Sequence, residues 1–138
     1  MDFNKNDINN KILNTINQKA LQKSGEKVLY YLLNNYSKEG YSLNDNFTKW
    51  QPLKNPRPKP YTDNPILYKT GNMKKSFRLT YDIASFTIDN EMYYSIYHQN
   101  GTDKMPARPI LYEDSNIEKI IKDCVFDELD KMFSQFKI

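Results

Sequence analysis

Apolar residues recur every three to four positions over residues 7–36, which is the spacing of an amphipathic helix. The residues on this face are Ile8, Ile12, Ile16, Ala20, Val28, Leu29, Leu32, Leu33 and Tyr36. Asp7 is placed as an N-cap and Gly40 as a C-terminal stop. Because glycine weakens a helix interior by roughly 1 kcal/mol, Ser24-Gly25 is a point of kinking or division. We expect one long helix or two collinear ones.

A second helical pattern covers residues 115–136. Ser115 and Glu118 have the spacing of a capping box at its start. The apolar stripe behind them consists of Ile117, Ile120, Ile121, Cys124, Val125, Leu129, Met132, Phe133 and Phe136. We expect this helix to pack on one face of a sheet.

Residues 66–112 predict a small, mostly antiparallel sheet of three or four strands with short helices. Apolar residues alternate from Phe77 to Ile83 and the phase shifts by one near Ala84, which predicts a hairpin of two short strands. A short helix is expected after Gly71, another over residues 91–99, and an edge strand over residues 107–112. The fold class is therefore α+β, with a single domain over residues 1–138.

Prolines separate the first helix from this sheet. Residues 47–65 include Pro52, Pro56, Pro58, Pro60 and Pro65, which exclude both a helix and a central strand. This segment is predicted to be an extended basic arm that carries Lys54, Arg57 and Lys59. A long loop inside a small domain usually has a function, although a solvated connector is the alternative.

Charge is distributed unevenly along the chain, whose net charge is only +3. Residues 49–78 contain eight basic residues and one acid, whereas residues 113–131 contain seven acids and three lysines. Such a molecule is suited either to bind nucleic acid or to bind copies of itself head to tail. In the second case, the basic arm of one subunit lies on the acidic last helix of the next.

Residue counts exclude several kinds of site. Cys124 is the only cysteine and His98 the only histidine, so an internal disulfide and any site with two histidine ligands are excluded. His98 lacks a recognisable nucleophile turn or oxyanion glycines nearby, which argues against catalysis. The carboxylates of the last helix fit no metal-binding motif. No apolar run approaches the length of a membrane span, and a soluble protein made in the cytosol is expected.

Four short patterns occur in order between Phe47 and Leu111. The first is Phe47, Trp50, Pro52 and Leu53, in the form F-x-x-W-x-P-L; the second is Ile66-Leu67 with Thr70, Gly71, Met73 and Ser76. The third is Tyr94, His98, Gln99 and Gly101, in the form Y-x-x-x-H-Q-x-G, and the fourth is Pro106-Ala107-Arg108-Pro109 with Leu111. Together they resemble the tailed-phage virion morphogenesis family, the Mu-like head-tail joining and tail completion proteins. Met73, Ser95, Ile110 and the proline-rich arm depart from the family pattern.

The resemblance implies a structural subunit without enzymatic activity or cofactor. Such a subunit forms a homo-oligomeric ring, six-fold or twelve-fold, in the neck or at the head-proximal end of the tail. Its partners are other phage neck or tail proteins and, possibly within the ring lumen, DNA; its location is the virion, after synthesis in the host bacterial cytoplasm.

The resemblance also gives roles to individual residues. Gly71 and Gly101 are expected to adopt backbone conformations closed to other residues, and Arg108 to reach a carboxylate or a main-chain carbonyl. On the plainer alternative, Trp50, Tyr94, Ile96 and Leu111 are core residues and His98 and Arg108 only satisfy local hydrogen bonds. The alternative function is a basic DNA-contacting module, since Trp50, Tyr61 and Tyr68 are interleaved with the basic residues.

Overall fold

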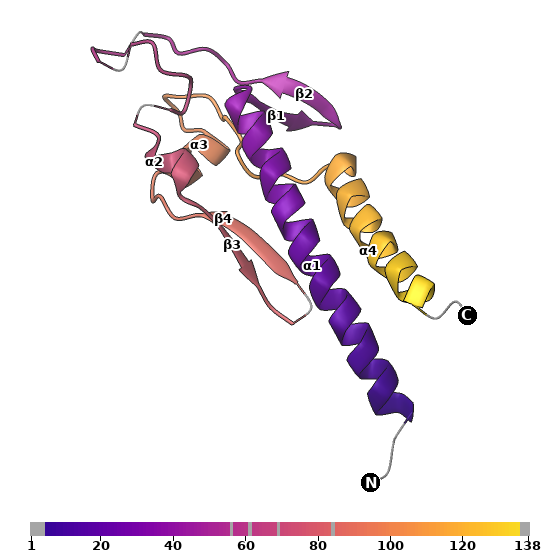
Figure 1. The fold of residues 1–138 in the computed structure, drawn as a ribbon. Coiled ribbons are helices and arrows are strands. Elements are labelled where there is room, and N and C mark those ends of the chain that lie inside the picture. Colours follow the sequence, from indigo (N-terminus) through magenta and orange to yellow (C-terminus); the bar gives the residue numbers. More distant parts are fainter. Residues whose placement is uncertain (1–4, 56, 61, 69, 84, 136–138) are drawn as a thin grey trace.

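The computed structural model describes residues 5–55, 57–60, 62–68, 70–83 and 85–135. Its elements in chain order are α1 (Lys5–Ser37), β1 (Gly40–Leu43), β2 (Asn46–Lys49), α2 (Asn72–Lys75), β3 (Phe77–Tyr81), β4 (Phe86–Asn90), α3 (Ser95–Asn100) and α4 (Ser115–Gln135). The α+β class predicted from the sequence is confirmed. Figure 1 shows α1 as the axis of the molecule, with α4 on one side and the β3–β4 hairpin on the other.

Helix α1 is continuous through Ser24-Gly25, so of the two expected arrangements the structure has one long helix and no division there. Close packing accounts for the glycine: a Cβ on Gly25 would lie 3.0 Å from Cδ1 of Leu79 and 3.1 Å from the Tyr81 ring. The glycine therefore gives β3 room to approach the helix. Asp7 lies inside the helix and is not its N-cap. Of the predicted apolar face, Ala20, Val28, Leu32 and Tyr36 are buried, while the side chains of Ile8, Ile12 and Ile16 lie outside those described.

The first hairpin was not predicted. Strands β1 and β2 pair antiparallel with Leu43 opposite Asn46, leaving a two-residue turn. The turn residues Asn44 and Asp45 have φ values of 50° and 64°, which identifies the left-handed type of turn that matches strand twist. Residues 47–49, assigned to the arm from the prolines that follow, therefore belong to a strand.

The second hairpin is the one predicted. Strands β3 and β4 pair antiparallel, with Leu79 opposite Ile88 and Tyr81 opposite Phe86, and Ala84 lies outside the described residues. Exposed Arg78 forms ion pairs with Asp89 and Glu91. The two hairpins form separate two-stranded sheets, and residues 107–112 form no strand. The prediction of a single sheet of three or four strands, with residues 107–112 as its edge strand, is therefore wrong.

Helix α4 packs mainly along α1 and runs antiparallel to it. Near one end Ile117 joins Val28 and Leu32 in a buried cluster, and near the other Lys23 forms a 2.5 Å ion pair with Glu128. The cluster also includes Phe86 and Ile88 of β4, so α4 reaches the second sheet at its start. The N-cap is Asp114, whose Oδ1 accepts a 2.8 Å hydrogen bond from the Ile117 N–H, and not the predicted Ser115. Phe136 lies outside the described residues.

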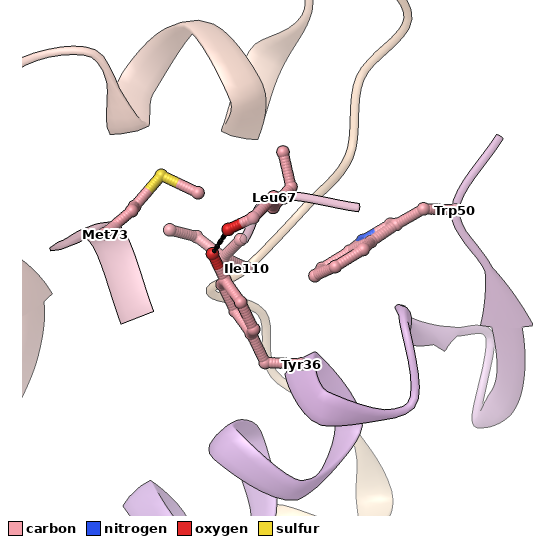
Figure 2. Packing of buried hydrophobic residues seen from close by; sticks show 5 residues of the cluster. All are labelled: Tyr36, Trp50, Leu67, Met73 and Ile110. Carbon is pink, nitrogen blue, oxygen red and sulfur yellow. Dashed lines mark hydrogen bonds between the residues drawn. The ribbon is translucent and has the colours of Figure 1, made fainter. Parts of the chain in front are cut away.

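A second core cluster lies where the C-terminal end of α1 meets the loops. It consists of Tyr36, Trp50, Leu67, Met73 and Ile110 (Figure 2). The Tyr36 ring meets the Trp50 ring edge to face at 5.1 Å, and its hydroxyl donates to the carbonyl of Leu67. Since the five residues come from five separate segments, this cluster determines how the loops around it are placed.

Candidate functional site

The residues of the four sequence patterns lie together around this second cluster. Trp50, from the first pattern, is 4% exposed and its indole N–H donates a 3.0 Å hydrogen bond to the carbonyl of Pro109, from the fourth. Its own backbone N–H donates to the carbonyl of Glu39 at 2.8 Å. Trp50, which directly follows β2, therefore connects the end of α1 to residues 106–111.

Arg108 connects residues 106–111 to the residues that follow Trp50. Its side chain is buried, and its Nε and one Nη donate to the carbonyls of Gln51 and Pro52 at 2.9 and 3.2 Å. Its backbone N–H donates to the carbonyl of His98 at 2.7 Å. The prediction that Arg108 reaches main-chain carbonyls is confirmed. A buried guanidinium needs such partners, because an unpaired charge in the interior is costly.

Gln99 makes the third connection, from α3. Its Oε1 accepts hydrogen bonds from the N–H groups of Ile110 and Leu111 at 2.8 and 2.9 Å, and its Nε2 donates to the Leu111 carbonyl at 2.5 Å. The amide thus replaces a strand partner for a segment that belongs to no sheet. Residues 110–111 were predicted to be part of an edge strand. Their backbone groups are instead satisfied by the Gln99 side chain, so they need no neighbouring strand.

Gly101 ends α3 in a conformation that other residues avoid. Its φ is 74° and its ψ is 172°. A Cβ there would lie 2.7 Å from the backbone nitrogen of Ala107. Gly71, with φ 81° and ψ −4°, precedes α2 in the left-handed region, which Asn44 and Asp45 also adopt in this chain. The expectation of a backbone closed to other residues is therefore confirmed for Gly101, whereas Gly71 only favours glycine.

Next to these connections lies a pocket of about 680 Å³, which we call the basic pocket. Its lining includes most of the predicted residues: Pro52, Leu53, Lys54, Arg57, Thr70, Gly71, Tyr94, His98 and Arg108. Lys104 and Met105 also line it and were not singled out in the sequence. Among the described residues, the lining contains four Lys or Arg side chains and no acid, so it favours negatively charged groups.

The loop that follows Trp50 folds back on itself. Arg57 donates two hydrogen bonds from one Nη, to the carbonyls of Asn64 at 3.0 Å and Pro65 at 2.9 Å, and the Thr62 hydroxyl donates to the Arg57 carbonyl at 2.9 Å. We call residues 51–55, 57–60 and 62–65 the arm loop. The extended arm predicted from the prolines is therefore a closed loop, and Lys59 lies on it outside the basic pocket.

His98 lies half-buried in the wall of the basic pocket. Its ring meets Tyr94 edge to face at 6.1 Å, and its Nδ1 is buried and finds no hydrogen-bond partner among the described residues. Burial lowers the pKa of His98, and the nearby charges of Arg108 and Arg57 lower it further. We infer that the imidazole is neutral in the folded protein at neutral pH.

Stability is expected to fall as pH drops below 6.5. Because the unfolded chain protonates its histidine near pH 6.5 and the folded chain only at lower pH, the unfolded state binds more protons between the two values. His98→Gln is expected to flatten this dependence between pH 7 and 5.5, as measured by urea unfolding at several pH values. His98 is the chain's only histidine, so an unchanged slope in the variant contradicts its assignment as the titrating group.

The described residues contain no group of three or more His, Cys, Asp or Glu side chains placed to hold a metal ion. Among the helices of the described chain, none is long and apolar enough to cross a membrane. Comparison of the chain with protein-family models, with curated proteins and with solved structures found no match.

Proposed function

We propose that this chain is a structural subunit of a tailed-phage virion, which assembles as a ring in the neck or at the head-proximal end of the tail. The residues that suggested the family in the sequence use their polar atoms to fasten main chain to main chain: Trp50, Gln99 and Arg108 all do so. Such a use suits a rigid building block better than an active site.

The observation that carries the proposal is an exposed apolar surface on α3 and the turn before it, which we call the α3 surface. Tyr93 in the turn and Ile96 and Tyr97 on α3 are 82%, 57% and 52% exposed although they are large and apolar. The expectation that Ile96 is a core residue is therefore wrong. Soluble monomers rarely expose such a patch without a partner for it. On α4, Phe126 and Phe133, which are 62% and 59% exposed, form a second apolar surface. Two apolar surfaces on different elements are what a subunit with a neighbour on each side requires.

Light scattering over a range of protein and salt concentrations tests the proposal. A single closed oligomer is expected, and Ile96→Lys on α3 is expected to shift it to smaller species. Ile83→Lys is the matched control, because Ile83 is an isoleucine outside the α3 surface and is even more exposed, at 77% against 57% for Ile96. A protein that stays monomeric at every concentration, alone and with purified neck and tail proteins, contradicts the proposal.

A DNA-contacting module is the second candidate, supported by the basic pocket with its four cations. Tight binding of duplex DNA by the monomer, weakening steeply with added salt, is the result that favours it. Lys104→Gln distinguishes the two functions, because Lys104 lines the basic pocket but lies outside the arm loop. The change is expected to reduce the salt dependence of DNA binding and to leave ring assembly intact.

A further inference from the structure

A second concave surface has the opposite charge to the basic pocket. It is a groove of about 650 Å³ between α1, β4 and the start of α4. Its apolar walls include Phe86, Ile88 and Ile121, which are half-buried, and its floor is the buried cluster of Val28, Leu32 and Ile117. The acids of its lining are Glu113, Asp114 and Glu118, and no Lys or Arg of the described chain lines it. We call this surface the acid-rimmed groove.

Two of the three rim carboxylates have no partner within the described chain. Asp114 is occupied as the N-cap of α4 and accepts a 2.5 Å hydrogen bond from the Tyr31 hydroxyl. Further along α4, Asp127 and Glu128 are neutralised by Lys23 and Lys131. Glu113 and Glu118 are exposed and form no ion pair among the described residues. Glu113 and Glu118 therefore leave two unpaired carboxylates beside the groove, while Asp123 and Asp130, which also lack an ion pair among the described residues, lie further along α4.

The arm loop has the complementary chemistry. Lys54 and Lys59 are exposed, form no ion pair in the described part of the chain, and stand among prolines such as Pro58 and Pro60. Proline-rich segments bind grooves lined by aromatic and apolar side chains, because little conformational freedom is lost on binding. The hydrogen bonds of Arg57 to Asn64 and Pro65 hold the loop closed before any partner arrives, which lowers that cost further.

The arm loop does not bind in the acid-rimmed groove of its own molecule. Figure 1 shows the loop after β2 projecting from the end of the molecule near α3, away from α4 and β4. An arm on one end and a complementary groove elsewhere form a heterologous pair, which repeats from copy to copy and closes into a ring if the rotation allows.

We propose that the arm loop of one copy occupies the acid-rimmed groove of the next, with Lys54 and Lys59 facing Glu113 and Glu118. This inference rests on the proposed function as a ring subunit and names the two surfaces that meet. The groove volume lies within the range of pockets that hold small ligands or a few residues of a partner.

The experiment uses two charge-reversed variants of the full chain. One carries Lys54→Glu and Lys59→Glu; the other carries Glu113→Lys and Glu118→Lys. Each variant places like charges at the proposed contact, so each alone is expected to associate about tenfold or more weakly than the unchanged protein by light scattering. Mixed in equal amounts, they present opposite charges to each other and are expected to recover assembly as mixed oligomers.

Lys49→Glu with Lys75→Glu is the control for net charge. These two exposed lysines lie on β2 and α2, outside both surfaces, and the change in charge equals that of the arm variant. Thermal unfolding of every variant checks that the fold is retained. Recovery in the mixture also shows that the contact joins different copies, because neither variant can satisfy it within one molecule.

The outcomes separate this inference from the proposed function. If the unchanged protein forms a ring and the arm variant assembles as well as the control, the arm contact is wrong and the ring stands. Failure of the mixture to recover assembly also overturns the contact. If the unchanged protein never assembles, the proposed function fails, and the inference with it.

Discussion

Replacing Trp50 by alanine is expected to lower the free energy of unfolding by about 3–5 kcal/mol. Trp50 is 4% exposed, its ring packs edge to face on Tyr36, and it belongs to the cluster that joins five segments. Removal of the indole leaves a large cavity and also leaves the Pro109 carbonyl without its donor. Urea unfolding followed by circular dichroism measures the change.

Two further variants separate the contributions of the ring and of its N–H group. Trp50→Phe keeps an aromatic ring and loses the donor, so we expect an intermediate cost of about 1–3 kcal/mol. Tyr30→Ala removes an aromatic ring that is 73% exposed on α1 and is expected to change stability by less than about 0.5 kcal/mol. A loss at Trp50 no larger than that at Tyr30 contradicts the assignment of Trp50 to the core.

Gly101→Ala is expected to cost on the order of 3 kcal/mol, since backbone strain and a steric clash add at one position. The φ of 74° with ψ of 172° is open to glycine alone, and the new Cβ would lie 2.7 Å from the backbone nitrogen of Ala107. Because the obstacle is main chain, no side-chain rotation relieves it. The expected relief is a displacement of the 102–107 loop, which loosens the basic pocket.

Asn100→Ala is the neighbouring control for this prediction. Asn100 is exposed at the end of α3, where alanine fits the helical backbone, and little change in stability is expected. Thermal unfolding of both variants gives the comparison. Equal stability of the two variants contradicts the strained conformation assigned to Gly101.

The helices and the second hairpin were predictable because their signals are local. Repeating apolar spacing gave α1 and α4 to within a few residues, and the change of phase near Ala84 gave β3 and β4. The first hairpin also had a local signal that was missed. Asn44-Asp45 lies between two short runs with apolar residues, and Asn and Asp adopt positive φ more readily than other residues that carry a side chain.

The features that were wrong depend on partners distant in the sequence. Gly25 is tolerated in α1 because β3 approaches it there, which no local pattern reveals. Residues 107–112 have the composition of an edge strand, yet they pair with no strand. The Gln99 side chain bonds to the backbone of Ile110 and Leu111, and the Arg108 side chain bonds to the Gln51 carbonyl. The sequence patterns named many of the residues that line the basic pocket, but as fold-defining or interface candidates. The pocket itself was not predicted, because its shape depends on the closed arm loop.

The packing of α1 against α4 has a consequence for how the protein is made. Tyr31 and its hydrogen-bond partner Asp114 are 83 residues apart. At about 5–20 residues per second, a ribosome needs on the order of 4–17 s to add that stretch. Throughout that time Val28 and Leu32 have been synthesised and Ile117, which covers them, has not. The nascent chain therefore presents an uncovered apolar helix face to chaperones and to neighbouring nascent chains until its last helix emerges.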